Sequence, residues 1–342
     1  MKGPASLRRR ATGFSLVELM VALALGLFLI GGILNIFLTN QQAFRTNDNL
    51  ARLQENARLA FELTAREIRL AGGNVCGAAP IGNVLNNRTT QWSSNWDAGP
   101  IRGFDGNQVA TDIVATGNSA TQRVDGTDAI VVLTGAMDTG VLLANHDAAT
   151  AVVQAGTVDH GLQTGEIVMV CDPQTAVIAQ ITAANSGTNA NLTFAAGASP
   201  PSPGNCTIGL GFPTVCGGTG TTKTFSPGGF VNRLTASFWY VGNRADGRRS
   251  LYRMNAAGTS EEVAEGVTDM QISYLLRNTT SGALGTEWVD ASAITDWTVS
   301  APQQVVAVRA RLLFQTAQSV GTDQQPLQRE LLQVISVRNR SL

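Results

Sequence analysis

The residue with the most distinctive chemistry is Glu18, a carboxylate at the head of an almost wholly apolar segment. Residues 19–38 read LMVALALGLFLIGGILNIFL, in which only Asn35 is polar. A helix of about twenty such residues spans the hydrocarbon core of a bilayer. An ionised carboxylate costs on the order of a few kcal/mol at the centre of a bilayer and less near its interface. We therefore expect Glu18 to be paired with a positive charge.

Cysteine and histidine are the other residue types that could supply special chemistry. They stand at Cys76, Cys171, Cys206, Cys216, His146 and His160. No CxxC pair or other metal-ligand spacing occurs, so the sequence predicts no metal site and no cofactor. If the body is exported, an even number of cysteines predicts two disulfides, for which three connectivities exist. We favour Cys206–Cys216, which closes a short loop rich in glycine and proline, and this leaves Cys76–Cys171. Free buried thiols are the alternative.

No set of residues typical of an enzyme is complete. Residues 217–224 (GGTGTTKT) are similar to a P-loop, but Thr222 stands where the glycine before the lysine is required. There is no GxSxG motif, and neither histidine has a nucleophile signature nearby. The acidic turns at residues 105–107 and 125–128 do not fit an EF-hand loop, so ordinary turns are the preferred interpretation over a Ca²⁺ site. We expect a structural protein, not an enzyme.

The positive charge is concentrated at the start of the chain. Residues 1–13 contain Lys2, Arg8, Arg9 and Arg10 and no acid, whereas the whole chain carries a net charge of −1. Basic residues in front of an apolar span remain on the cytoplasmic side of the membrane. We therefore expect a single-pass membrane protein whose C-terminal body lies on the side of the membrane opposite to the basic leader. The total charge gives no indication of a nucleic-acid partner.

The apolar segment is predicted to continue as an amphipathic helix. Apolar or small residues recur at steps of three and four, at Leu50, Leu53, Ala57, Ala60, Thr64 and Ile68. Glu62 and Arg66 form an i, i+4 pair, and Gly72-Gly73 is a plausible stop. We expect a helix over residues 14–72, transmembrane over about 16–38 and amphipathic over about 39–71. Its stripe should dock onto the chain's own body; a solvated coiled coil is the alternative.

Glycines interrupt the apolar segment at Gly26 and Gly31-Gly32. They would either bend the helix or let a second helix approach closely.

Residues 73–342 are predicted to form a β-rich body. Short β-type runs lie between turns at residues 128–133, 167–170, 176–181 and 234–241. Residues 306–314 alternate in polarity, which predicts a long strand with one buried face, and residues 331–337 resemble its partner. Residues 185–229 are irregular and predict either a functional loop or a disulfide-pinned surface excursion. The fold class is α+β, a long N-terminal helix packed on an antiparallel sheet.

The run Gly13-Phe14-Ser15-Leu16-Val17-Glu18-Leu19 behind a basic leader resembles the class III signal of type IV prepilins and pseudopilins. The resemblance implies a pilin-like fold and cleavage between Gly13 and Phe14 by a prepilin peptidase, which removes leader 1–13. It also implies N-methylation of Phe14, whose freed amine is largely cationic at neutral pH. In a helix bundle, Glu18 would pair with the Phe14 amine of a neighbouring subunit and set their axial register.

Features of the C-terminal third resemble one particular group of pilins. They are LYR at 251–253, VAEGVTDMQISY at 263–274, VVAVRARLL at 305–313 and VRN at 337–339. Their order is similar to that of PilW-type minor pilins. The resemblance implies a structural subunit of a tip complex that primes assembly of the type IV pilus, with roles in adhesion and twitching motility. The implied partners are other minor pilins, the major pilin, the prepilin peptidase, the inner-membrane assembly platform, membrane lipid and a large tip adhesin.

Two other functions remain open at this point. A J-type pseudopilin of type II secretion would undergo the same processing, and its gene neighbours, pilus genes or secretion genes, would separate it from a pilus subunit. A single-pass anchored periplasmic binding protein would keep its leader, because it needs no cleavage at Gly13.

Overall fold

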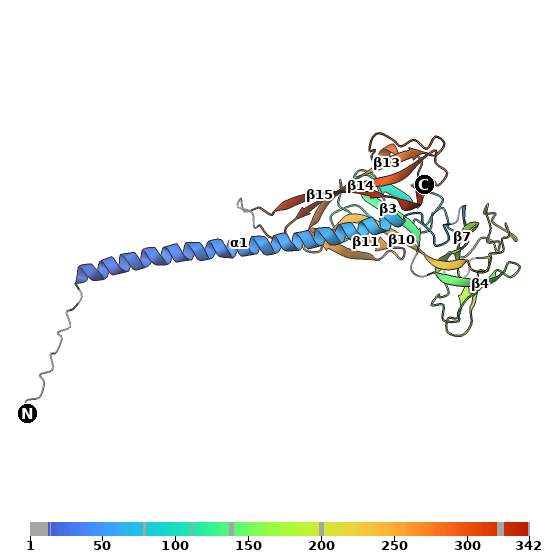
Figure 1. The fold of residues 1–342 in the computed structure, drawn as a ribbon, viewed down its shortest axis with the longest axis horizontal. Helices are drawn as coiled ribbons and strands as arrows, with labels where there is room; N and C mark the ends of the chain where they lie inside the picture. The colour runs from blue at the N-terminus through green and yellow to red at the C-terminus, as the bar shows by residue number, and fades with distance from the viewer. Residues whose placement is uncertain are drawn as a thin grey trace, which may run out of the picture. The chain divides into compact units, whose positions relative to one another are not determined.

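The chain folds as one long helix followed by strands, as Figure 1 shows. The computed structural model describes residues 13, 15–77, 80–110, 112–136, 140–197, 202–319 and 325–340. The chain divides into two units, one of Met1–Arg52 with Thr316–Leu327 and one of Leu53–Gln315 with Gln328–Leu342. A helix first and sheets afterwards confirm the predicted α+β class.

The strands are short at first and long towards the C-terminus. They are β1 (Ile81–Asn83), β2 (Ile101–Phe104), β3 (Ala129–Gly135), β4 (Val141–Asp147), β5 (Val152–Ala155), β6 (Ile167–Asp172), β7 (Thr175–Gln180), β8 (Ala183–Ala184), β9 (Asn191–Thr193), β10 (Phe230–Asn243), β11 (Arg249–Asn255), β12 (Ser260–Glu265), β13 (Val267–Asn278), β14 (Gln303–Gln315) and β15 (Gln328–Ser336). Short 3-10 helices, η1 (Ala291–Ala293) and η2 (Arg338–Arg340), follow β13 and β15. Each run that the sequence predicted as a strand lies largely within one of these elements.

Strand β10 joins most of the body into a 12-stranded sheet by pairing with β3, β4, β6 and β11. A second sheet has the order β13-β14-β15 and is antiparallel throughout. The 12-stranded sheet is mixed, because β1 pairs with β7 in parallel, with Ile81 opposite Ala176. The body was predicted as an antiparallel sheet, and the β1–β7 pair departs from that prediction. The pair joins segments far apart in the sequence that no local pattern connects.

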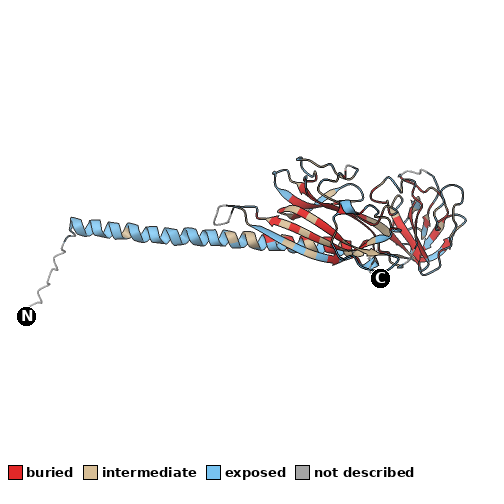
Figure 2. Ribbon diagram, turned by 90° about the horizontal axis from the view of Figure 1, so that it is seen from above, coloured by how far each residue is buried: buried red, intermediate tan, exposed pale blue. Residues whose placement is uncertain are grey.

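Helix α1 (Leu16–Leu70) contains the whole predicted apolar segment. In its first part the large apolar side chains from Leu16 to Phe44 are exposed, and Figure 2 shows this part in pale blue. Residues 16–38 extend about 35 Å, close to the hydrocarbon thickness of a bilayer. The helix is thus long and apolar enough to cross a membrane.

The second part of α1, from Leu53 onward, belongs to the β-rich unit and buries one face. The buried residues are Leu53, Ala57, Ala60, Thr64, Ala65 and Ile68. All of these except Thr64 form one core with apolar side chains of β10, β13 and β14, among them Trp239, Met270 and Phe314. This packing confirms that the predicted stripe docks onto the chain's own body from Leu53 to Ile68.

The helix ends where its sequence predicts. Gly72 has a φ of +74°, a left-handed conformation that favours glycine after a helix. The side-chain Nδ2 of Asn339 donates to the carbonyls of Leu70 and Ala71, at 3.4 and 3.3 Å. The C-terminal end of the described chain therefore satisfies the Ala71 carbonyl and adds a second hydrogen bond to the Leu70 carbonyl, which also accepts the Gly73 N–H at 2.9 Å.

One surface ion pair differs from the expected one. Glu62 pairs with Arg58, with 2.7 Å between Arg58 Nε and Glu62 Oε1, so the predicted pairing with Arg66 was wrong. Both arginines stand four residues from Glu62, and spacing alone does not choose between them. Both partners are exposed, so the pair contributes little to stability.

Glu67 fastens α1 to the large sheet. Its Oε2 accepts a hydrogen bond from Trp239 Nε1 at 2.6 Å, and its Oε1 lies 2.9 Å from Arg253 Nε. We expect Glu67→Ala to lower the free energy of unfolding by about 2–3 kcal/mol, because the buried indole N–H would lose its acceptor. Glu55→Ala, on the exposed face of the same helix, should change it by less than about 0.5 kcal/mol. Urea unfolding of the detergent-solubilised chain measures both; equal effects would contradict the anchoring role.

Candidate functional site

The helix that carries Glu18 begins with a capping box. The Ser15 N–H donates to Glu18 Oε2 at 3.3 Å, and the Glu18 N–H donates to the Ser15 hydroxyl oxygen at 3.2 Å. Side chains three residues apart thereby satisfy backbone donors that a helix start leaves free. The interpretation of Glu18 as a charge alone missed this second role, which the Ser-x-x-Glu spacing would have predicted.

The predicted cleavage site lies directly before this turn. Gly13 is exposed, and no heavy atom lies within 4 Å of the position that a Cβ would take there. Phe14, the predicted site of cleavage and N-methylation, lies outside the described residues. The exposure of Gly13 is compatible with access by a peptidase, and the roles of Gly13, Phe14 and Glu18 stay predictions.

The glycines of the apolar segment leave free space on α1. A Cβ at Gly26, Gly31 or Gly32 would meet no heavy atom within 4 Å, and the helix is continuous through all three. The same positions are where a second helix could approach most closely.

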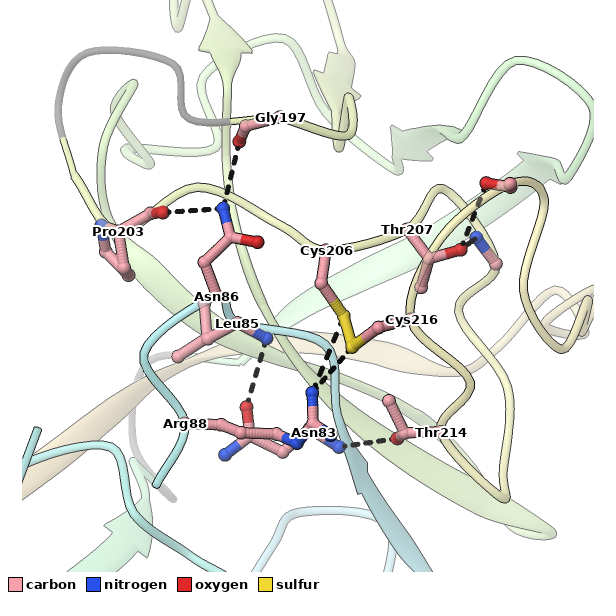
Figure 3. The surroundings of a disulfide bond; sticks show 12 residues. Asn83, Leu85, Asn86, Arg88, Gly197, Pro203, Cys206, Thr207, Thr214 and Cys216 are labelled. Atoms are coloured by element: carbon pink, nitrogen blue, oxygen red, sulfur yellow. Dashed lines mark hydrogen bonds between the residues drawn. A yellow bond between two sulfur atoms is a disulfide. The ribbon is translucent and has the colours of Figure 1, made fainter. Parts of the chain in front are cut away.

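The disulfide Cys206–Cys216 lies close to β1, as Figure 3 shows. Arg88 Nη1 donates to Cys216 Sγ at 2.6 Å and lies 3.6 Å from Cys206 Sγ. The second disulfide joins Cys76 to Cys171, which is fully buried in β6. These are the two pairings that the sequence analysis favoured among three.

Side-chain amides hold the described part of the predicted loop 185–229. Asn205 is fully buried; its Nδ2 donates to the Gln180 carbonyl at 2.8 Å, and its Oδ1 accepts the Gln180 N–H at 2.8 Å. These two bonds reproduce what a neighbouring strand would offer. Asn86 Nδ2 donates to the carbonyls of Gly197 and Pro203 (Figure 3). The contacts pin the described part of this loop to the rest of the body, and whether it has a function stays open.

The lysine of the P-loop-like run forms an ion pair. Lys223 Nζ lies 2.8 Å from Asp172 Oδ2, and the Asp172 side chain is fully buried. Burial alone would raise the pKa of Asp172, but the ammonium of Lys223 and the N–H groups of Gln174, Ser226 and Thr175 hold it below its usual value. Lys223 therefore anchors the loop to the end of β6.

Both histidines accept backbone hydrogen bonds. His146 Nδ1 accepts the N–H of Phe225 and His160 Nδ1 accepts the N–H of Leu162, each at 3.1 Å, and both rings are buried. Among the described residues, no group of three or more His, Cys, Asp or Glu could hold a metal ion.

The acidic turns belong to a buried polar cluster. The Asp105 carboxylate accepts the N–H groups of Ala291 and Ser292, each at 2.8 Å. Asp128 Oδ2 accepts the N–H of Ile272 in β13 at 2.7 Å. The carboxylates thus satisfy backbone donors of η1 and β13, which agrees with ordinary structural turns.

Asp128 should make stability depend on pH. Burial raises its pKa from 3.8 to about 6, and the charge of Asp105 adds to this, against the lowering effect of the Ile272 N–H. A raised carboxyl pKa means that its contribution to stability is complete below pH 3.8 and is lost as the pH rises through about 6. The loss should be about 2–3 kcal/mol.

The test compares wild type with Asp128→Asn in urea unfolding between pH 4 and pH 7. The amide keeps an acceptor for the Ile272 N–H and does not titrate, so the difference in unfolding free energy between the two chains should change by about 2–3 kcal/mol over this range. Other carboxylates contribute equally to both chains. Parallel curves would show that Asp128 titrates normally.

Two parts of the chain match known families. Residues 238–339 match the family model of type IV pilus-assembly protein W, PilW, and residues 8–34 match the prokaryotic N-terminal methylation motif. No curated protein and no solved structure matches the chain.

These two matches fit the geometry described above. The methylation motif contains Gly13, Phe14, the capping box and the start of the exposed apolar helix. The PilW match begins within β10 and contains β11 to β15, the strands that supply much of the core around the second part of α1. Over these two stretches the chain is therefore similar to PilW-type pilins of the type IV pilus, and its exposed apolar helix is long enough to anchor it in a membrane.

Proposed function

We propose that the chain is a structural, non-catalytic minor pilin that joins other minor pilins in a tip complex and primes assembly of the major pilin. The observation that carries the proposal is the joint presence of the methylation motif at residues 8–34 and the PilW region at residues 238–339 in one chain. Neither match alone separates a pilus subunit from its relatives.

Processing would occur just before α1, next to the exposed Gly13. A prepilin peptidase would cut between Gly13 and Phe14 and leave the basic leader 1–13 in the cytoplasm. The freed Phe14 amine would be methylated and remain largely cationic at neutral pH.

Assembly would then exchange lipid for protein around the apolar helix. Packing between helices replaces contacts with lipid, and the glycines at Gly26, Gly31 and Gly32 allow a close approach. Glu18 would accept the methylated amine of a neighbouring subunit, so that neither charge is left unpaired in a medium of low dielectric constant. The β-rich body would remain in the periplasm until the subunit enters the pilus and would there meet other minor pilins, the major pilin and a tip adhesin.

Gly13→Ala tests the processing step. We expect the wild-type chain from native membranes to begin at methylated Phe14 and the variant to keep residues 1–13, because the peptidase would no longer recognise its site. Intact mass and N-terminal sequencing measure both. A wild-type chain that still begins at Met1 would exclude pilin processing.

Removal of the chain from its cells tests the priming step. We expect few or no surface pili, while the major pilin accumulates in the inner membrane at its normal level. The wild-type gene should restore the pili, and Gly13→Ala should not. Normal pili together with a defect in protein secretion would instead identify a J-type pseudopilin.

One feature favours a second candidate, the anchored periplasmic binding protein. A cavity of about 770 Å³ in the β-rich unit is lined by Trp96, Asp97, Pro100 and Phe212, among others. Burial raises the pKa of Asp97 above its ordinary value. An intact leader on the mature wild-type chain, with normal pili in cells that lack it, would favour this function.

A further inference from the structure

The two edge strands of the three-stranded sheet, β13 and β15, differ in whether their outward backbone groups are hydrogen-bonded. Along β13 the outward backbone groups are occupied. The Arg249 guanidinium donates to the Thr268 carbonyl, and the Asp128 N–H donates to the Met270 carbonyl. The Asp128 carboxylate accepts the Ile272 N–H, and the Gly285 N–H donates to the Leu276 carbonyl. The backbone N–H and carbonyl of Tyr274 are both hydrogen-bonded to the backbone of Val289. An edge covered in this way cannot accept another strand.

The opposite edge, along β15, is open. Ile272 points its N–H away from β14, so its register partner Ala310 points its backbone groups towards β15, where it lies opposite Gln333. Backbone groups alternate in direction along an antiparallel strand. Glu330, Leu332 and Val334 therefore point theirs outward, and within the described part of the chain no hydrogen bond reaches them.

Glu330 at the start of this edge is paired with Arg311, but the side chains that follow it do not protect the edge. Leu332 and Val334 are 57% and 54% exposed and stand next to each other on one face. By contrast, β12 is an edge strand of the large sheet, where, among the described strands, it pairs with β11 alone. It carries Glu262 and Glu265, which form ion pairs with Arg244. Charged side chains are a common protection of edge strands, whereas exposed apolar ones favour pairing with a further strand.

A hollow beside β15 offers a place for one side chain of such a strand. It has a volume of about 210 Å³ and is lined by Gln54, Ala57, Arg58, Phe61, Arg329 and Leu331. Arg58 is paired with Glu62, whereas Arg329 forms no ion pair within the described residues. The hollow therefore suits an apolar side chain with an acidic neighbour near Arg329.

A second copy of this strand would not supply that acid. In an antiparallel pairing of β15 with itself about a two-fold axis normal to the sheet, the residues opposite Arg329 come from the same face of β15. That face presents Leu331, Gln333 and Ile335, none of them acidic.

We propose that β15 is a docking edge for an extended strand of a different protein chain. The strand bonds to the outward groups of Glu330, Leu332 and Val334, places an apolar side chain in the hollow and an acidic one against Arg329, and covers Leu332 and Val334. Backbone bonds give such a contact its affinity and the side-chain positions its specificity. The contact does not depend on a role in pilus priming.

The test is photo-crosslinking in the native cells, with the full chain carrying benzoylphenylalanine in place of Val334. The matched control carries it in place of Leu142, a side chain of β4 that is 51% exposed. We expect one adduct with a different protein, at least about tenfold more abundant from position 334, whose crosslinked peptide alternates apolar residues and contains an acid. Equal yields from the two positions, or an adduct with a second copy, would overturn the proposal.

Two variants test the chemistry of the contact. Arg329→Glu should lower the yield at position 334 about tenfold, because it opposes the acid of the partner, and Arg329→Lys should keep it. Leu332→Pro should abolish the adduct, because it removes an outward N–H that the sheet itself does not use. Circular dichroism and the two disulfides should match wild type in the arginine variants. An adduct that survives Arg329→Glu unchanged would overturn the assigned charge contact.

Discussion

Replacement of Arg123 by methionine should lower the free energy of unfolding by about 4 kcal/mol, which could leave the body unfolded at 37 °C. The side chain of Arg123 is fully buried. Its guanidinium donates to the carbonyls of Gln108 (2.8 Å), Asp105 (2.8 Å), Phe104 (3.3 Å) and Thr127. Methionine fills a similar volume but leaves these acceptors without donors in an interior that water does not reach.

The arginine also balances the charge of the polar cluster. Burial lowers its own pKa, while Asp128, Asp125 and Asp105 act in the opposite direction. Since the guanidinium lowers the pKa of Asp128, its removal should raise that pKa further above about 6. A variant that loses stability only through packing would leave the pH profile unchanged.

Urea unfolding followed by tryptophan fluorescence measures the stability change at several pH values. Arg66→Met on the exposed face of α1 is the matched control and should change stability by less than about 0.5 kcal/mol. Arg123→Lys should lie between the two, because an ammonium cannot reach all the carbonyls that the planar guanidinium reaches. A loss below about 1 kcal/mol for Arg123→Met would show that water replaces the guanidinium.

The sequence predicted well those elements whose signal is local and periodic. Alternation along residues 306–314 identified β14, because Val308, Ala310, Leu312 and Phe314 face the core while Arg309 and Arg311 remain half-exposed. The steps of three and four from Leu53 to Ile68 identified the docked face of α1 for the same reason. In both cases one face of a regular element meets one core, so periodicity carries the information.

The features that sequence reasoning missed depend on contacts between distant segments. The parallel pair β1–β7 joins residues about a hundred positions apart. Arg123 lies in a polar loop, where an arginine is normally solvated, and only the folded chain brings the carbonyls of two loops around it. No local pattern distinguishes such an arginine from the exposed Arg58.

In the candidate site, too, local features could be predicted from the sequence and contacts between distant segments could not. Ser15 and Glu18 stand three residues apart before an apolar run, a spacing that predicts a capping box. The capping box was overlooked because Glu18 was interpreted only as a charge. Lys223 stood in a run similar to a P-loop, but its ion pair with Asp172 depends on a fold that brings the loop to the end of β6. Local motifs can therefore be read from the chain, whereas the partners of loop residues cannot.

Glu18→Gln should reduce incorporation of the subunit into pili by about tenfold or more and leave leader removal and membrane insertion intact. Glutamine keeps the capping box, since its amide oxygen can still accept the Ser15 N–H, but it cannot neutralise the methylated amine of a neighbour. An unpaired ammonium within lipid costs on the order of a few kcal/mol. Each change of about 1.4 kcal/mol in free energy shifts an equilibrium constant tenfold. Immunoblots of sheared pili and of membranes measure how the subunit is distributed between the two. N-terminal sequencing of the subunit from both fractions checks that the leader has been removed.

Ser15→Ala is the complementary test, because it weakens the capping box and keeps the charge of Glu18. It removes the hydroxyl that accepts the Glu18 N–H, at a cost of about 1 kcal/mol in helix stability, but leaves the carboxylate free to pair with an amine. Incorporation should therefore stay near the wild-type level. If Ser15→Ala fails and Glu18→Gln succeeds, the carboxylate serves to begin the helix, and the register between subunits must come from packing along the apolar face of α1. If the order is as expected, one side chain serves the folding of the free subunit through its backbone bond and assembly through its charge.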